Sequence, residues 1–201
     1  SRWTARRLAE LGVPESRVSV VEPGTEKVLT ENADGGRPQG ATAPAVKSPV
    51  RLLCVATLTP RKGHAELVDA LAPLHASDWR LDCVGSADRD PATAAAVRAH
   101  VERLGLVGRI ALHGELPPAE IARHYREADV FVLASHLEGY GMALADALAH
   151  GLPIVSTTAG AIPDTVPTTA GLLVRPDDPV ALRAALAALL DDPALRARLA
   201  A

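Results

Sequence analysis

The sequence predicts an α/β domain in which helices cover both faces of a parallel sheet. Apolar runs of strand length alternate with segments of helical periodicity, an order typical of strand–helix–strand units. The 201 residues are also enough to bury a sizeable core. Hydrophobic residues make up 48% of the chain and aromatic residues only 2%, so this core must be built from Ala, Val, Leu and Ile.

Seven apolar runs are the predicted strands, and five periodic segments are the predicted helices. The strands cover residues 18–22, 50–57, 79–85, 109–114, 129–135, 153–157 and 171–175. The helices cover residues 64–75, 93–104, 119–127, 142–150 and 180–190. Asp90-Pro91 and Asp178-Pro179 each place a capping acid before a first-turn proline, which is how helices often start. Asp192-Pro193 has the same form and predicts one more helix start.

The two ends and one internal segment differ from this pattern. Residues 1–16 are predicted as a linker helix, because SRWTARRLAELG is basic and amphipathic, and residues 17–201 as the main domain. Residues 32–49 are rich in Gly, Pro and Ala without periodicity and predict a flexible surface loop. The chain stops eight residues after Pro193, so the sequence looks like a piece of something longer at both ends.

Charge and composition exclude several classes of function. The net charge of −3, with no basic residues interleaved among aromatic ones, argues against binding to nucleic acid. There is no signal peptide and no apolar run of about 18 residues, so no transmembrane segment is expected. Cys54 and Cys83 lie in apolar, strand-like runs. A single disulfide stays open, but buried reduced thiols in a cytoplasmic protein are the preferred interpretation.

Three loops are placed where a doubly wound sheet binds its ligands, beyond the carboxyl ends of the strands. They contain Arg61–Gly63, Gly85-Ser86 and the segment SHLEGYG at 135–141. Free N–H groups at a helix start attract an anion, and glycines let it approach closely. With Arg61 and Lys62 added, the first loop predicts a diphosphate site. The alternative is that both basic residues are solvated and the glycines only turn the chain.

Several aspartates and histidines are further candidates for metal or ligand binding. Residues 88–90 have the D-x-D spacing of some metal sites, but Asp90 is better explained as a helix cap, so no metal site is predicted. The seven histidines show no zinc-type spacing. His64 either touches a phosphate or lies on the surface at a helix start. His150 follows Asp146 by four residues and pairs with it across one turn in the simplest interpretation.

Three segments in order carry a resemblance to a known family. VATLTPRKGHAELVDAL, DVFVLASHLEGYGMALADALAHGLPIVSTTAGAIPDTV and GLLVRPDDPVALRAAL together resemble the C-terminal, donor-binding half of retaining glycosyltransferases with the GT-B fold. Glycosyltransferase family four is the nearest match, from about residue 17 to the end. The resemblance implies a Rossmann-like domain that binds a nucleotide diphosphate sugar and transfers the sugar with retention of configuration. It implies no separate cofactor and no metal.

The same resemblance implies that the N-terminal acceptor domain is missing from this sequence. A cytoplasmic location is expected, with a peripheral membrane contact through the missing half left open. Two other classes of function stay open. A nucleotide-sugar epimerase or a phosphorylase shares this architecture, and a noncatalytic nucleotide-sugar-binding domain would also fit the sequence.

Residue roles are carried over from the family position by position. Lys62, expected to be exposed, matches a lysine that contacts the diphosphate, and Glu138 matches the glutamate that lies against the donor sugar; these two are the expected catalytic residues. Asp146 matches the acid that holds the ribose hydroxyls, and His136 is the histidine placed nearest the ligand. The expected donor-binding residues are Arg61, Gly63, Gly85, Ser86, Glu115, Leu116, His136, Gly139, Tyr140, Gly141, Met142 and Asp146.

The sequence departs from the family pattern in three places. Asp146 replaces a glutamate and is one methylene shorter. Ala56 or Thr57 stands where the family has an arginine, so Arg61 or a backbone amide must take its part, or phosphate binding is weaker. The family's glycine-pair-then-glutamate segment is altered at residues 159–164.

Overall fold

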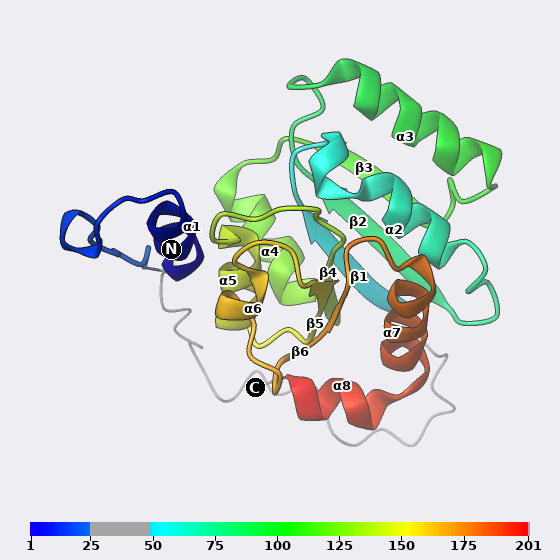
Figure 1. The fold of residues 1–201 in the computed structure, drawn as a ribbon. Helices are drawn as coiled ribbons and strands as arrows, with labels where there is room; N and C mark the ends of the chain where they lie inside the picture. Colours follow the sequence, from blue (N-terminus) through cyan, green and yellow to red (C-terminus); the bar gives the residue numbers. More distant parts are fainter. Residues whose placement is uncertain (25–48, 201) are drawn as a thin grey trace.

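A computed structural model of the chain describes residues 1–24 and 49–200. In this part of the chain, six strands form one sheet in the order β3-β2-β1-β4-β5-β6, and every neighbouring pair is parallel (Figure 1). The strands are β1 Val50–Val55, β2 Trp79–Val84, β3 Ile110–Gly114, β4 Val130–Leu133, β5 Ile154–Thr157 and β6 Gly171–Val174. The predicted Rossmann-like α/β architecture is confirmed, and each of these six strands lies inside a predicted range.

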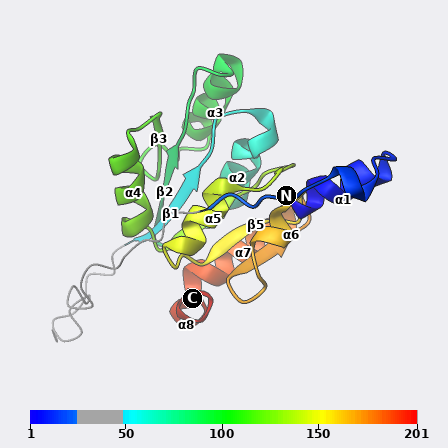
Figure 2. The same cartoon turned by 90° about the vertical axis from the view of Figure 1, so that its left-hand side faces the viewer.

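Helices cover both faces of the sheet. They are α1 Arg2–Glu10, α2 His64–Leu71, α3 Pro91–Arg103, α4 Pro118–Glu127, α5 Met142–Ala149, α6 Ile162–Thr165, α7 Pro179–Asp191 and α8 Pro193–Leu199, with short 3₁₀ turns at Glu15–Arg17 and Pro60–Lys62. Helix α2 packs against α3 and α7 on one face, whereas α4 and α5 contact strands from the other (Figures 1 and 2). Among the described residues, no helix is long and apolar enough to cross a membrane.

Helix starts follow the predicted capping chemistry. Asp90 and Asp178 each accept a hydrogen bond from the backbone N–H three residues on, at 3.0 and 2.9 Å. Asp192 does the same at 2.9 Å and starts α8. These carboxylates satisfy N–H groups that have no partner inside their helices. Asp90, the second aspartate of the D-x-D segment, therefore acts as a helix cap.

Burial explains why the central strands are apolar without alternation. Every residue of β4 and β5 is buried, as expected for parallel strands with helices on both faces. The two large aromatic side chains Trp79 and Phe131 are fully buried, and aliphatic side chains fill most of the remaining core. The prediction of an aliphatic core is thus confirmed.

Two predictions about secondary structure are wrong and one cannot be compared. Residues 18–22 form no strand; Val20 and Val21 are 42% and 83% exposed, and no described strand pairs with them. An apolar run without a neighbour has no partners for its backbone polar groups, so β-propensity alone does not make it a strand. The four-residue helix α6 was not predicted. Apart from Pro49, the predicted loop at 32–49 lies outside the described residues.

Helix α1 lies beside α6 in both views (Figures 1 and 2). Arg6 Nη2 donates to both carboxylate oxygens of Asp164, at 3.0 and 2.7 Å. Helix α1 has no buried residue of its own, and this ion pair joins it to α6.

The order of the strands fixes where a ligand can bind. From β1 the chain winds outward to β2 and β3, and from β4 it winds outward the other way to β5 and β6. The adjacent strands β1 and β4 therefore form the topological switch point, where successive helices lie on opposite faces. The loops that leave their carboxyl ends, residues 56–63 and 134–141, are brought side by side there.

Candidate functional site

An ion pair joins the two loops at the switch point. Lys62 Nζ donates to Glu138 Oε1 at 2.6 Å. The two side chains are only 16% and 8% exposed. The expectation that Lys62 is exposed was therefore wrong, because its ammonium group turns inward to neutralise a carboxylate that would be costly to bury alone.

Arg61 is the second cation at Glu138. Its Nη1 lies 3.6 Å from Glu138 Oε1 and also donates to the backbone carbonyl of Leu137. About half of its side chain is exposed. Arg61 thus holds the loop that carries Glu138, while Lys62 makes the shorter contact with the carboxylate.

Buried hydroxyl groups hold the two loops together from behind. Ser135 Oγ lies 3.1 Å from the carbonyls of both Arg61 and Leu137, and His136 N–H donates to Arg61 O at 2.8 Å. Thr157 Oγ1 in turn donates to Ser135 O at 2.5 Å. This chain of hydrogen bonds runs from β5 through the β4 loop to the β1 loop, and it fixes the backbone on which Lys62 and Glu138 stand.

Gly63 lets the two loops approach. It has φ +68°, and a Cβ built on it would lie 1.9 Å from Ala134 O. A side chain at this position would therefore meet the backbone of the neighbouring loop.

A third loop supports Glu138. Ala161 N–H donates to Glu138 O at 2.8 Å. Gly160 has φ +62°, and a Cβ there would lie 2.2 Å from the same oxygen. The segment 159–164, which departs from the family pattern in sequence, thus supports the backbone of Glu138 and supplies Asp164 for the contact with α1.

A cavity of about 520 Å³ opens in front of these loops. Eight of the predicted residues line it: Lys62, Gly85, Ser86, Glu115, Glu138, Tyr140, Gly141 and Met142. The structure adds seven residues that were not in the predicted set: Val55, Ala56, Thr57, Val84, Arg89, Leu133 and Ala143. The cavity thus joins the carboxyl ends of β1, β2, β3 and β4 in one site.

Arg89 is the chemically important addition. It lies in the loop after β2, and with Lys62 it is one of two cationic residues that line the cavity. Sequence reasoning treated residues 88–90 only as a metal motif or a helix start. The available signal was the position of Arg89, four residues beyond Gly85 at the carboxyl end of a strand.

Six predicted residues do not line this cavity: Arg61, Gly63, Leu116, His136, Gly139 and Asp146. Arg61 and Gly63 act behind it, as described above. His136 Nε2 lies 3.0 Å from Glu66 Oε1, and its Nδ1 lies 3.8 Å from Asp177 Oδ1. His136 therefore faces carboxylates of other elements rather than the cavity, contrary to its predicted position nearest the ligand.

Asp146 lies just behind the cavity on α5. Met142 and Ala143 line the cavity, and residues three and four positions on lie on the same side of a helix. Burial raises the pKa of Asp146, and the nearby His150 opposes this increase. His150 Nδ1 contacts the backbone carbonyl of Asp146 at 2.8 Å, so the simple pairing of imidazole with carboxylate was not the arrangement found.

His64 lies in the core, so both of its predicted positions were wrong. It is 3% exposed, and its Nε2 is 3.8 Å from Cys54 Sγ. Cys54 and Cys83 are paired in register on β1 and β2 and are both free thiols. The hydrogen bond from Cys83 lowers the pKa of Cys54 to about 5, and the same bond together with burial raises the pKa of Cys83. The prediction that both thiols are buried is confirmed.

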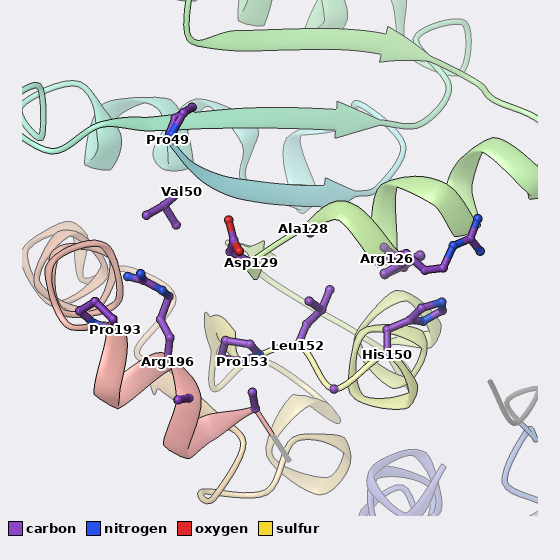
Figure 3. A pocket seen from close by; sticks show the side chains of 14 residues that line it. Pro49, Val50, Arg126, Ala128, Asp129, His150, Leu152, Pro153, Pro193 and Arg196 are labelled. Atoms are coloured by element: carbon purple, nitrogen blue, oxygen red, sulfur yellow. The ribbon is translucent and has the colours of Figure 1, made fainter. Parts of the chain in front are cut away.

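A second cavity, of about 450 Å³, lies at the amino end of the sheet, opposite the candidate site (Figure 3). Val50, Asp129 and Pro153, at the amino ends of three strands, line it together with Arg196 of α8. Arg196 Nη1 donates to Leu190 O at 3.1 Å, at the end of α7. None of the predicted site residues borders this cavity, and doubly wound parallel sheets bind ligands at the carboxyl ends of their strands.

The fold is that of the Rossmann-like domains of GT-B glycosyltransferases. A glycosyltransferase from Rickettsia africae superposes with a TM-score of 0.85 at 22% identity, over 100% of this chain and 55% of that one. Anabaena HepE, solved in complex with UDP and glucose, superposes with a TM-score of 0.70 at 23% identity, over 76% of this chain and 42% of that one.

Sequence comparison identifies the family. The chain belongs to the family described as glycosyl transferases group 1, whose model matches residues 49–192. It is 32% identical to the D-inositol 3-phosphate glycosyltransferase of Acidothermus cellulolyticus, over 98% of this chain and 46% of the relative. The enzyme of the same name from Xylanimonas cellulosilytica is also 32% identical, over 100% and 50%. The chain therefore spans about half the length of these relatives.

Replacing Gly63 tests how closely the two loops approach. Gly63→Ala should lower the free energy of unfolding by at least about 3 kcal/mol, because the new Cβ meets Ala134 O. Gly105→Ala is the matched control: Gly105 also has φ +68° but has no atom within 4 Å of the added Cβ, so it should lose only about 1–2 kcal/mol. Urea unfolding measures both. Equal losses would show that the close approach carries no energetic weight.

Proposed function

We propose that this chain is the donor-binding half of a retaining glycosyltransferase and that the 520 Å³ cavity binds a nucleotide diphosphate sugar. One observation carries the proposal: Lys62 and Glu138 meet at 2.6 Å on the wall of this cavity, at the topological switch point. A cation for the diphosphate and a carboxylate for the sugar are thereby placed one beside the other. The sugar-nucleotide class is supported by the family and by the UDP-bound structural neighbour.

The diphosphate is assigned to Lys62 and to the start of α5. Gly141 precedes this helix and makes no side-chain cap, so the first-turn N–H groups of α5 are available to an anion. Met142 and Ala143 place this helix start on the cavity wall. In the reaction, Lys62 and these amides stabilise the negative charge that develops on the departing diphosphate.

Arg89 is proposed to take over part of the phosphate binding that the family assigns to an arginine. Ala56 or Thr57 stands at the position of that arginine; both line the cavity, and neither brings a charge. Arg89 reaches the same cavity from the loop after β2. Arg61, which could also replace the family arginine, contacts Glu138 instead.

The two acids are proposed to bind opposite parts of the donor. Glu138 lies at the centre of the site and would accept hydrogen bonds from the sugar. Asp146 stands one turn along α5 and would accept them from the ribose hydroxyls. The base is assigned to the loops that contain Gly85, Ser86 and Glu115, which form the cavity wall at β2 and β3. Retention of configuration, an N-terminal acceptor domain and a cytoplasmic location belong to the same proposal.

A double-mutant cycle tests the role of Lys62. Lys62→Met should weaken binding of UDP by about 1.5–3 kcal/mol, the scale of a hydrogen bond to a charged group. It should also destabilise the fold, because Glu138 keeps only the longer contact with Arg61. Adding Glu138→Gln should recover stability without recovering UDP affinity. Calorimetry and urea unfolding measure the two effects separately, and unchanged UDP affinity in Lys62→Met would remove Lys62 from the site.

A second experiment separates the two acids. Asp146→Ala should weaken binding of UDP and of UDP-glucose alike, by roughly tenfold for a lost pair of hydrogen bonds. Glu138→Gln should not weaken binding of UDP, because it frees Lys62 from its ion pair. It should reduce the preference among UDP-sugars, because it removes the carboxylate proposed to face the sugar. Asp146→Glu, which restores the longer family side chain, is the control and should bind UDP at least as well as the parent. Unchanged affinities in both variants would contradict the proposed division of roles.

The proposal also assigns no divalent cation to the diphosphate, because fixed cations and helix amides supply the positive charge. UDP affinity measured in EDTA should agree within about twofold with that in millimolar magnesium. A loss of affinity in EDTA that Asp88→Asn reproduces would instead assign a metal to the D-x-D segment at residues 88–90.

A further inference from the structure

We propose that Asp82, His113 and His124 form a binding site for a divalent transition metal ion of the zinc type. The three residues stand on β2, β3 and α4, outside the proposed donor cavity. One ligand atom from each lies within 4.8 Å of the other two. This site depends on none of the residues assigned to the nucleotide sugar.

The three side chains are already close to a coordinating arrangement. His113 Nε2 lies 2.5 Å from Asp82 Oδ1, and the rings of His113 and His124 are 4.9 Å apart. Zinc binds nitrogen and oxygen at about 2.0–2.2 Å, which places the ligands of a tetrahedral site about 3.5 Å from one another. Small side-chain rotations would bring all three into that range. About a third of Asp82 and of His113 is exposed, so an ion can enter from solvent.

The backbone of β3 supports this assignment. Leu112 pairs with Cys83 and Gly114 pairs with Val84, so His113 has no register partner on β2. This irregularity lies on the edge strand of the sheet. Bulges of this kind re-aim a side chain at the expense of regular pairing. Here the residue left over is the imidazole that contacts Asp82.

The ligand set selects the class of ion. Two imidazoles and one carboxylate suit zinc and its transition-metal neighbours, whereas magnesium and calcium prefer oxygen ligands only. Three protein ligands leave a fourth position for water. The second group of metal-type residues, Cys54, His64 and Cys83, is buried in the core.

A bound ion would connect three elements at the edge of the sheet. It would tie the edge strand β3 to β2 and both to α4. Because the folded chain presents the three ligands together, zinc should stabilise it by mass action.

Zinc titration of tag-free protein, stripped with EDTA and returned to metal-free buffer, tests the site. Calorimetry should show one saturable site, and zinc should raise the melting temperature. His113→Ala and His124→Ala should each weaken zinc affinity by at least about tenfold. Asp82→Asn, which keeps the shape of the side chain, should do the same and decides the case if a histidine variant fails to fold.

Two control variants separate this site from other zinc ligands in the chain. His100 also contacts a carboxylate, Asp69, at 2.6 Å, but among the described residues this pair belongs to no group of three metal-type ligands. The variant His100→Ala should therefore bind zinc like the parent. The double variant Cys54→Ser/Cys83→Ser should also bind like the parent, and cobalt bound to the parent should show no thiolate charge-transfer band. Absence of saturable zinc binding, affinity that survives all three ligand variants, or loss of affinity in the cysteine variant would overturn the proposal.

Discussion

The contact between Lys62 and Glu138 is the interaction on which the rest of the site depends. These residues are 76 positions apart in the chain and meet at 2.6 Å because β1 and β4 are neighbours in the sheet. A carboxylate as buried as Glu138 needs a counter-ion, and Lys62 provides it. The surrounding features serve this contact: Gly63 lets the loops approach, Ser135 joins their backbones, and Gly160 makes room behind Glu138.

Much of the fold could be predicted because local sequence and tertiary structure agree. Six of seven strands were found, since buried parallel strands appear as unbroken apolar runs, and three helix starts followed from Asp-Pro pairs. The segment 18–22 has the same apolar character but no neighbouring strand among the described residues. Propensity describes what a segment can do, and pairing decides what it does. Helix α6, with only four residues, is too short to leave a periodic signal.

The site was predictable to the level of loops and less so to the level of side-chain direction. The rule that ligands bind at the carboxyl ends of strands predicted the loops that contain Lys62, Gly85 and Glu138, and all three residues line the cavity. Direction depends on partners far away in the sequence. His136 turns to Glu66, 70 positions earlier, and His64 turns inward to Cys54. Neither partner is marked by a motif, and Arg89 was hidden because its neighbour Asp90 already explained that segment as a helix start.

The preformed ion pair also constrains how an anion can bind. Lys62 and Arg89 bring two positive charges to the cavity, and Glu115 and Glu138 bring two negative ones, so the formal charges of these four side chains cancel. In the proposed function, a diphosphate is attracted by Arg89, by the start of α5, and by Lys62 once its ammonium group turns from the carboxylate toward phosphate. Glu138 would then lose its shorter contact inside a buried site. Arg61, 3.6 Å away and outside the cavity, stays as its counter-ion during this exchange. Under the proposed function, Arg61 would act through Glu138: it would allow one carboxylate to pair with Lys62 in the free domain and to face the sugar in the complex.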